Sequence, residues 1–182
     1  MIKLSVFVVA SVGIFAVSRR SLLNPHSHGF FRFFAFEFLV VLILLNADSW
    51  FSDPFSSIQI ISWVLLLCSA ILVFHGFNLL RLIGKPEGSE ASNTLLRFEK
   101  TTSLVTVGIY KYIRHPLYGS LLFLGWGSFL KEPSPISVLL IIAITANVIA
   151  TARVEESENL WRFGTEYSAY MKTTKRFIPF LY

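Results

Sequence analysis

The 182-residue sequence is short of cysteine and of charge, and each shortage excludes a class of protein. Its one cysteine, Cys68, lies inside an apolar run, so no disulfide can form within the chain, and we expect this thiol to pack between helices. Charged residues make up 15% of the chain, whereas apolar residues make up 54% and the mean hydropathy is +0.62. This is more apolar surface than one small water-soluble core needs, so the sequence predicts an integral membrane protein.

Five apolar runs predict five membrane-spanning helices and therefore an all-α, polytopic fold. They cover residues 4–17, 30–45, 58–83, 117–130 and 136–152. The first run is not typical of a cleaved signal peptide, because Arg19 and Arg20 stand where a small-residue cleavage site would lie. The fourth run would rise only about 21 Å as a helix, against about 30 Å of hydrocarbon. We therefore expect its start to be recessed among the other helices, where it would form a pocket.

Basic residues gather on one side of these spans and determine the predicted orientation. The chain has 16 Lys and Arg against 11 Asp and Glu, a net charge of +5. If the loop at residues 18–32 is cytoplasmic, alternation leaves only Lys3 and Lys131 outside, together with the stretch that holds Asp48 and Asp53. We predict an external N-terminus, with the active site and C-terminus in the cytoplasm. The positive charge then faces anionic lipid headgroups, and no nucleic-acid partner is expected.

Two polar segments beside the last two apolar runs give the strongest functional signal. Residues 102–120 hold several tyrosines and an Arg-His-Pro corner directly before the fourth run. Residues 155–170 follow the fifth run and begin with two adjacent carboxylates, Glu155 and Glu156. Polar and ionisable groups this close to lipid are unfavourable unless they line a ligand site. We therefore predict that the two segments meet in one site on the cytoplasmic face.

The corner made by Arg114, His115 and Pro116 is expected to begin a helix. A residue before proline favours extended backbone, and proline suits the first turn of a helix. The free amides of that turn, with Arg114 beside them, are expected to hold a carboxylate or a phosphate. A structural interpretation also stays open, in which Arg114 meets lipid headgroups and His115 is hydrogen-bonded within the fold.

Aromatic and acidic side chains around the corner suit a ligand that carries an adenine ring and a positive charge. The rings of Tyr110, Tyr112 and Tyr118 can hold a sulfonium by cation–π attraction of about 0.5–2 kcal/mol. Each of them also fits an interfacial aromatic belt. Glu155 and Glu156 can accept hydrogen bonds from ribose hydroxyls or an α-amino group, or they can form a solvated helix end.

The motifs Leu-Val-Thr-x-Gly-x-Tyr, Arg-His-Pro-x-Tyr, Glu-Glu and Phe-Gly-x-Glu-Tyr-x-x-Tyr occur here in this order. Together they resemble the membrane methyltransferases typified by isoprenylcysteine carboxyl methyltransferase and phosphatidylethanolamine N-methyltransferase. The resemblance covers about residues 100–180, so we divide the chain into N-terminal transmembrane helices, 1–83, and a methyltransferase-like region, 84–182. It implies S-adenosylmethionine bound beneath a cap formed by the last helix. It also implies a lipophilic or membrane-embedded methyl acceptor, such as an isoprenylcysteine carboxylate or a phospholipid amine.

Carried over residue by residue, the resemblance implies a cofactor site drawn from both segments. Its members are Thr102, Ser103, Leu104, Val105, Tyr110, His115, Pro116, Leu117, Tyr118, Glu155 and Glu156. Thr102 departs from the histidine of the prenylcysteine enzymes, and Ser120 departs from a glycine found in many relatives. Arg153 is a candidate for contact with the acceptor, although its offset from the glutamates differs from that of the family's arginine. No catalytic base and no metal site are predicted.

Two other functions stay open. Membrane sterol reductases, which use NADPH, look similar around Arg-His-Pro-x-Tyr, but their chains are usually much longer. A non-enzymatic membrane scaffold would leave the clustering of tyrosine, histidine and glutamate unexplained. Three polar residues inside the spans are candidates either to line the pocket or to form hydrogen bonds between helices: Glu37, His75 and Asn78.

Overall fold

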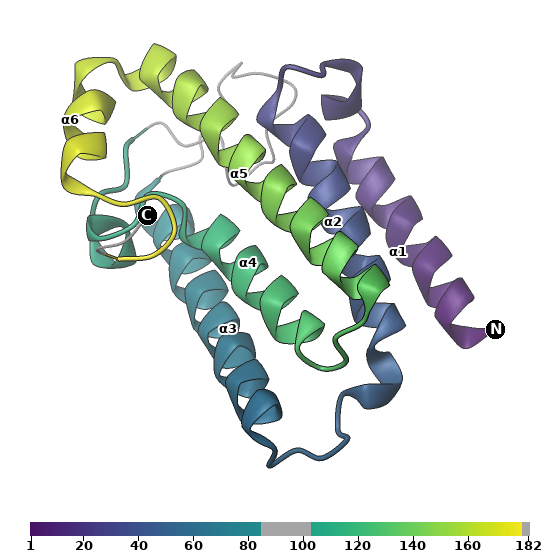
Figure 1. Ribbon diagram of the computed structural model, residues 1–182. Helices are drawn as coiled ribbons and strands as arrows, with labels where there is room; N and C mark the ends of the chain where they lie inside the picture. Colours follow the sequence, from purple (N-terminus) through teal and green to yellow (C-terminus); the bar gives the residue numbers. More distant parts are fainter. Residues whose placement is uncertain (85–102, 180–182) are drawn as a thin grey trace.

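The computed structural model describes residues 1–84 and 103–179, and over these ranges the fold is all-α, as predicted (Figure 1). The helices are α1 (Ile2–Ser18), α2 (His28–Leu45), α3 (Ser57–Ile83), α4 (Pro116–Phe129), α5 (Pro135–Phe163) and α6 (Thr165–Thr173). Each predicted span forms a helix. Among the described residues, α2, α3 and α5 are each long and apolar enough to cross a membrane, and α1 is a shorter apolar helix. The count of five spans stays a prediction.

The helices alternate in direction, so their loops gather at two opposite ends (Figure 1). At one end Lys3 lies 2.7 Å from Asp48, and Ser49 donates a hydrogen bond to Glu132. The other end carries the α1–α2 loop, the start of α4 and the end of α5. The acid-bearing stretch predicted to lie outside therefore shares an end with the N-terminus. Which end faces the cytoplasm stays a prediction.

α3 packs closely against the short helix α4 through three small residues spaced seven positions apart: Ser62, Ser69 and Gly76. Ser62 Oγ donates to the Gly127 carbonyl at 2.7 Å, and Ser69 Oγ donates to the Ser120 carbonyl at 2.8 Å. A Cβ on Gly76 would lie 3.2 Å from the nearest side-chain atom of α4. Small residues and hydrogen bonds between helices are the usual means of close packing in lipid, where a hydrophobic driving force is absent. The start of α4 is thereby held against the last turns of α3.

α2 packs against α5, and this contact contains most of the apolar core. Leu42, Ile144 and Val148 are at most 1% exposed. α4 joins the two helix pairs, because it contacts α5 as well as α3. Asn46, just after α2, donates from Nδ2 to the Ser128 carbonyl of α4 at 2.9 Å. The pairs α2–α5 and α3–α4 therefore form one bundle.

Three charged residues near the bundle surface are held by specific partners. Glu37 of α2 accepts a hydrogen bond of 2.7 Å from Ser11 of α1, which ties the outermost helix to the bundle. Lys131 is 4% exposed, lies 3.5 Å from the centre of the Trp63 ring and donates to Gln59 at 3.0 Å. With Lys3 paired to an aspartate, both basic residues predicted to lie outside have their charge neutralised or shielded locally.

The small-residue packing of α4 predicts that Gly127→Leu destabilises the protein. A Cβ at Gly127 would lie 2.9 Å from Leu66 and 3.2 Å from the carbonyl of Ser62. Overpacking of this kind lowers the free energy of unfolding by about 1–3 kcal/mol. Thermal unfolding in detergent should show a lower midpoint. Gly13→Leu is the control, since nothing lies within 4 Å of a Cβ there, and equal effects of the two changes would contradict this packing.

Candidate functional site

The Arg-His-Pro corner is paired with the segment that follows α6. Lys175 N donates to the Tyr112 carbonyl at 3.0 Å, Arg114 N to the Lys175 carbonyl at 2.8 Å, and His115 N to the Arg176 carbonyl at 3.1 Å. These bonds form a short parallel bridge immediately before α4. The protein's own C-terminal segment therefore occupies the amides of Arg114 and His115, which lie just before the first turn of α4. The binding of an anion by the amides of that first turn stays a prediction.

Glu156 of α5 lies against this pairing and binds both of its arginines. Arg114 Nε donates to Glu156 Oε1 at 2.9 Å, and Arg176 donates to Oε1 at 3.1 Å and to Oε2 at 2.7 Å. The Glu156 side chain is only 5% exposed, so its charge needs close partners. Arg114 also donates to the carbonyls of Met171 and Thr174. Its positive charge is therefore paired within the fold with the carboxylate of Glu156.

His115 lies between this ion-pair cluster and a cavity. Its ring stacks on Tyr118, with centroids 5.5 Å apart and planes 25° apart, and it lies 6.3 Å from the Phe177 ring. Its Nε2 is 3.4 Å from Glu156 Oε1. The two segments that the sequence predicted to meet are therefore in contact around His115.

Helix α6 packs over the 3₁₀ helix Gly108–Lys111 through tyrosines. The Tyr170 hydroxyl donates to the Tyr110 carbonyl at 2.6 Å, and the Tyr110 hydroxyl donates to the Gly76 carbonyl at 3.4 Å. Burial raises the pKa of both phenols, and the Glu155 carboxylate adds to the effect at Tyr110, so both remain protonated donors. α6 thus holds the main chain of Tyr110, and α3 accepts the hydrogen bond from its ring hydroxyl. Its predicted role as a cap over a cofactor stays a prediction.

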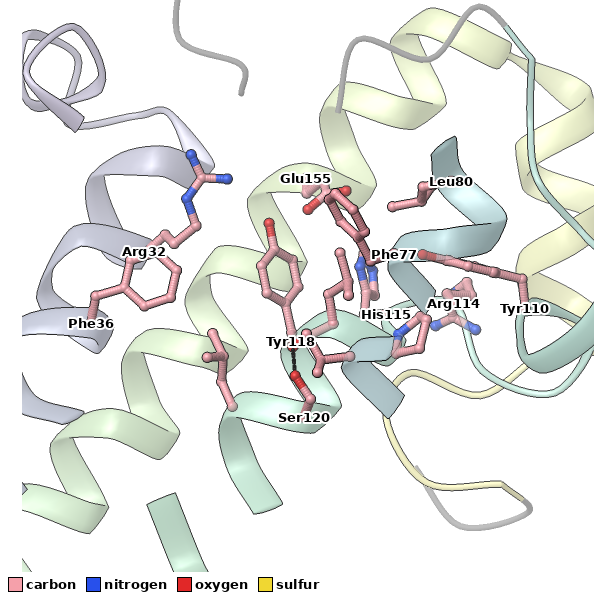
Figure 2. Close-up of a pocket in the computed structure, with 14 residues that line it drawn as sticks. Arg32, Phe36, Phe77, Leu80, Tyr110, Arg114, His115, Tyr118, Ser120 and Glu155 are labelled. Atoms are coloured by element: carbon pink, nitrogen blue, oxygen red, sulfur yellow. Dashed lines mark hydrogen bonds between the residues drawn. The ribbon is translucent and has the colours of Figure 1, made fainter. Parts of the chain in front are cut away.

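A cavity of about 250 Å³ lies between α2 and α3, next to the start of α4 (Figure 2). Arg32 and Phe36 of α2 stand on one side, Phe77 and Leu80 of α3 on the other. Most of the wall is apolar. Val73 and Phe77, which line it, are 47% and 39% exposed, so the cavity reaches the apolar outer surface of the bundle.

Six of the predicted cofactor residues line this cavity: Tyr110, His115, Pro116, Leu117, Tyr118 and Glu155. Glu155 is notable because its Oε2 is buried and has no hydrogen-bond partner in the part of the chain that the structure describes. A buried acceptor without a donor is unfavourable, so a ligand that donates to it would be stabilised there.

The other predicted residues do not line the cavity. The lining does not include Ser103, Leu104 or Val105, which come before Tyr110 in the sequence. Thr102 lies outside the described residues. Arg153 is exposed on α5, and Glu156 is held by the two arginines. Glu37, His75 and Asn78 are also absent from the wall, and Glu37 instead connects two helices, the alternative that the sequence left open. The cofactor role of the predicted residues stays a prediction.

The N-terminal helices contribute to the wall through other residues than the three polar candidates that the sequence suggested. These supply Arg32, Phe36, Val73, Phe77 and Leu80 to the wall, although residues 1–83 carry none of the motifs. One signal was present: Arg32 stands within the Phe-rich run, and an arginine inside an apolar span is rarely without function. Its position beside the first loop otherwise indicates only the topology.

The two adjacent glutamates are predicted to differ in their effect on stability. Glu156→Gln leaves two guanidinium groups without their buried counter-charge, and loss of one partner in such a cluster reduces stability by about 3–5 kcal/mol. Glu155→Gln removes no described hydrogen bond and should change stability little. Unfolding of the two variants in detergent, without ligand, checks this. Equal destabilisation would contradict the assignment of Glu156 as the structural member of the pair.

Comparison with known proteins places the chain in a family. No curated protein and no solved structure matches it. The family model of the phospholipid methyltransferases matches residues 58–166, more than half of the chain, from the start of α3 to the start of α6. The match begins well before the motifs at residues 100–180 and includes the α3, α4 and α5 walls of the cavity. With its long apolar helices, this chain is an integral membrane protein that belongs to the phospholipid methyltransferase family.

Proposed function

We propose that the protein transfers a methyl group from S-adenosylmethionine to a lipophilic acceptor that enters the cavity from the bilayer. One observation carries this proposal: in a member of this family, the cavity combines an unsatisfied carboxylate, aromatic faces and an apolar wall that reaches the bundle surface. A small membrane scaffold would not need these features in one place.

The residues around the cavity fit a cationic nucleoside ligand. Glu155 places negative charge and a free acceptor oxygen at the wall, where an ammonium or ribose hydroxyl can donate to it. Tyr110, His115 and Tyr118 add aromatic rings that can attract a sulfonium or stack on adenine. We infer that Glu156 supports this site indirectly, by holding His115 and the start of α4 in place.

When bound, S-adenosylmethionine would supply a methyl group on a positively charged sulfur. Formation of a bond from the acceptor's lone pair to the methyl carbon would break the sulfur–methyl bond and leave a neutral thioether. Charge is neutralised or dispersed in this step, so the protein needs no oxyanion-type stabilisation. Its residues act by positioning and by excluding water: the apolar walls from α2, α3 and α4 enclose the reactants, and Glu155 orients the donor. This accounts for a site in which we assign no catalytic base.

We also propose that the end of the bundle with the site faces the cytoplasm. The described part of this end carries Arg19, Arg20, Arg81 and Arg153, whereas the opposite end carries Lys3 and Lys131 with their local partners. Arginine and lysine accumulate on the cytoplasmic side of membrane proteins. That side also gives a soluble methyl donor access to the cavity.

The proposed function predicts that S-adenosylmethionine or S-adenosylhomocysteine stabilises the detergent-solubilised protein against heat. At a ligand concentration about 100 times the Kd, the gain in free energy of unfolding is about 2.7 kcal/mol. NADPH should give no gain. Stabilisation by NADPH alone would instead favour the reductase alternative.

Glu155→Gln and His115→Ala are each predicted to weaken this ligand-dependent stabilisation by about tenfold or more in Kd, because each removes a direct contact. Glu166→Gln is the control for charge, since Glu166 is exposed on α6 and does not line the cavity. Titration of each variant with S-adenosylhomocysteine, followed by thermal unfolding, gives the affinities. Unchanged affinity in both cavity variants would refute the placement of the donor.

A further inference from the structure

The helices α2 and α5 are joined in two different ways along their length. In one half they share the apolar core, whose members nearest to the site are Ala35 of α2 and Ala152 of α5. Beyond this core lie the first turns of α2 and the last turns of α5, and here a polar contact between His28 and Glu158 joins the two helices. The charged residues that α2 and α5 contribute to the cavity both belong to this second half.

The Glu158 carboxylate binds the first residue of α2 with both of its oxygens. Oε2 lies 2.6 Å from His28 Nδ1, and Oε1 accepts a hydrogen bond from the main-chain N–H of His28 at 3.3 Å. Ser27 stands at the N-cap position of α2, but its hydroxyl donates to the carbonyls of Ser21 and Asn24 and does not cap the helix. An acidic group at a helix N-terminus is stabilising, because it accepts from free amides and meets the positive end of the helix dipole. A residue of α5 therefore supplies the cap that the sequence next to α2 does not.

This contact lies beside two walls of the cavity. Arg32 and Phe36 form the α2 wall, and Glu155 stands on another wall (Figure 2). Arg32 follows His28 by four positions on α2. Glu155 likewise precedes Glu158 by three positions on α5, and residues at these spacings share a helix face. A contact one helical turn away therefore governs how far the α2 wall stands from Glu155.

We propose that Glu158 is a positioning residue, which acts through its contact with His28 to set the width of the cavity and thereby its affinity for the methyl donor. Neither side chain lines the cavity, so the effect passes through the placement of α2. The inference rests on the proposed function, because it concerns the same cavity. It gives a role in donor binding to the start of α2, which lies outside the residues that the family model matches.

Removal of the Glu158 carboxylate should loosen α2 locally without unfolding the protein. The Glu158 side chain is 40% exposed, and the apolar core between α2 and α5 is unchanged by its loss. Only the first turns of α2 lose their cap and their tie to α5. In the ligand-free Glu158→Ala variant, main-chain hydrogen exchange should therefore be faster at residues 28–35, and unchanged at residues 110–118, which another set of contacts holds.

Titration with S-adenosylhomocysteine in detergent, at a temperature at which every variant is folded, tests the inference. Glu158→Ala should weaken binding about threefold or more, although every residue that lines the cavity is kept. Glu158→Gln should recover part of the affinity, because its side-chain oxygen can still accept a hydrogen bond from His28. Two controls should bind as the wild type does: Glu166→Ala, which removes an exposed carboxylate from α6, and Gly127→Leu, which destabilises α4 far from this contact.

Three results would overturn the inference. They are a Glu158→Ala variant that binds as tightly as the wild type, a Glu158→Gln variant that binds no better than Glu158→Ala, and a Gly127→Leu variant that loses as much affinity as Glu158→Ala. In each case S-adenosylhomocysteine still binds the wild type, so only the positioning role of Glu158 is lost. If S-adenosylhomocysteine does not bind the wild type at all, the methyltransferase proposal itself fails, and this inference fails with it.

Discussion

The buried carboxylate of Glu156 joins three parts of the chain that are far apart in sequence. It binds Arg114 before α4, Arg176 after α6, and approaches His115, while belonging itself to α5. A buried charge cluster of this kind is stable only when every member is present, so the three segments must be in place together. The stack of His115 on Tyr118 and the bridge to the C-terminal segment lie directly beside this contact.

The same contact explains why two glutamates stand side by side. Successive residues of an α-helix point about 100° apart, so adjacent side chains cannot face the same partner. Glu156 faces the two arginines, and Glu155 faces the cavity. One carboxylate therefore organises the site, and the other is available to a ligand. The two adjacent glutamates therefore have different roles, which the Glu-Glu motif alone does not distinguish.

Much of the fold could be predicted from the sequence because apolar runs, arginines and prolines act locally. The positions of the apolar helices, the shortness of α4 and its start at Pro116 all follow from local rules. The meeting of the Arg-His-Pro corner with the glutamates was also predicted, from the unfavourable placement of such groups beside lipid.

The different roles of Glu155 and Glu156 could not be predicted, since they depend on the rotation of α5 about its axis. The pairing of Arg114 and His115 with residues 175–176 was missed because it depends on a contact between distant segments. Arg32 was missed as a wall residue for the same reason.

A structure of the protein with S-adenosylhomocysteine bound would show directly which glutamate contacts the ligand. We expect the ligand in the cavity between α2 and α3, hydrogen-bonded to Glu155, with Glu156 still bound to Arg114 and Arg176. A ligand held by Glu156, with its bonds to the two arginines broken, or a ligand bound outside this cavity, would contradict it.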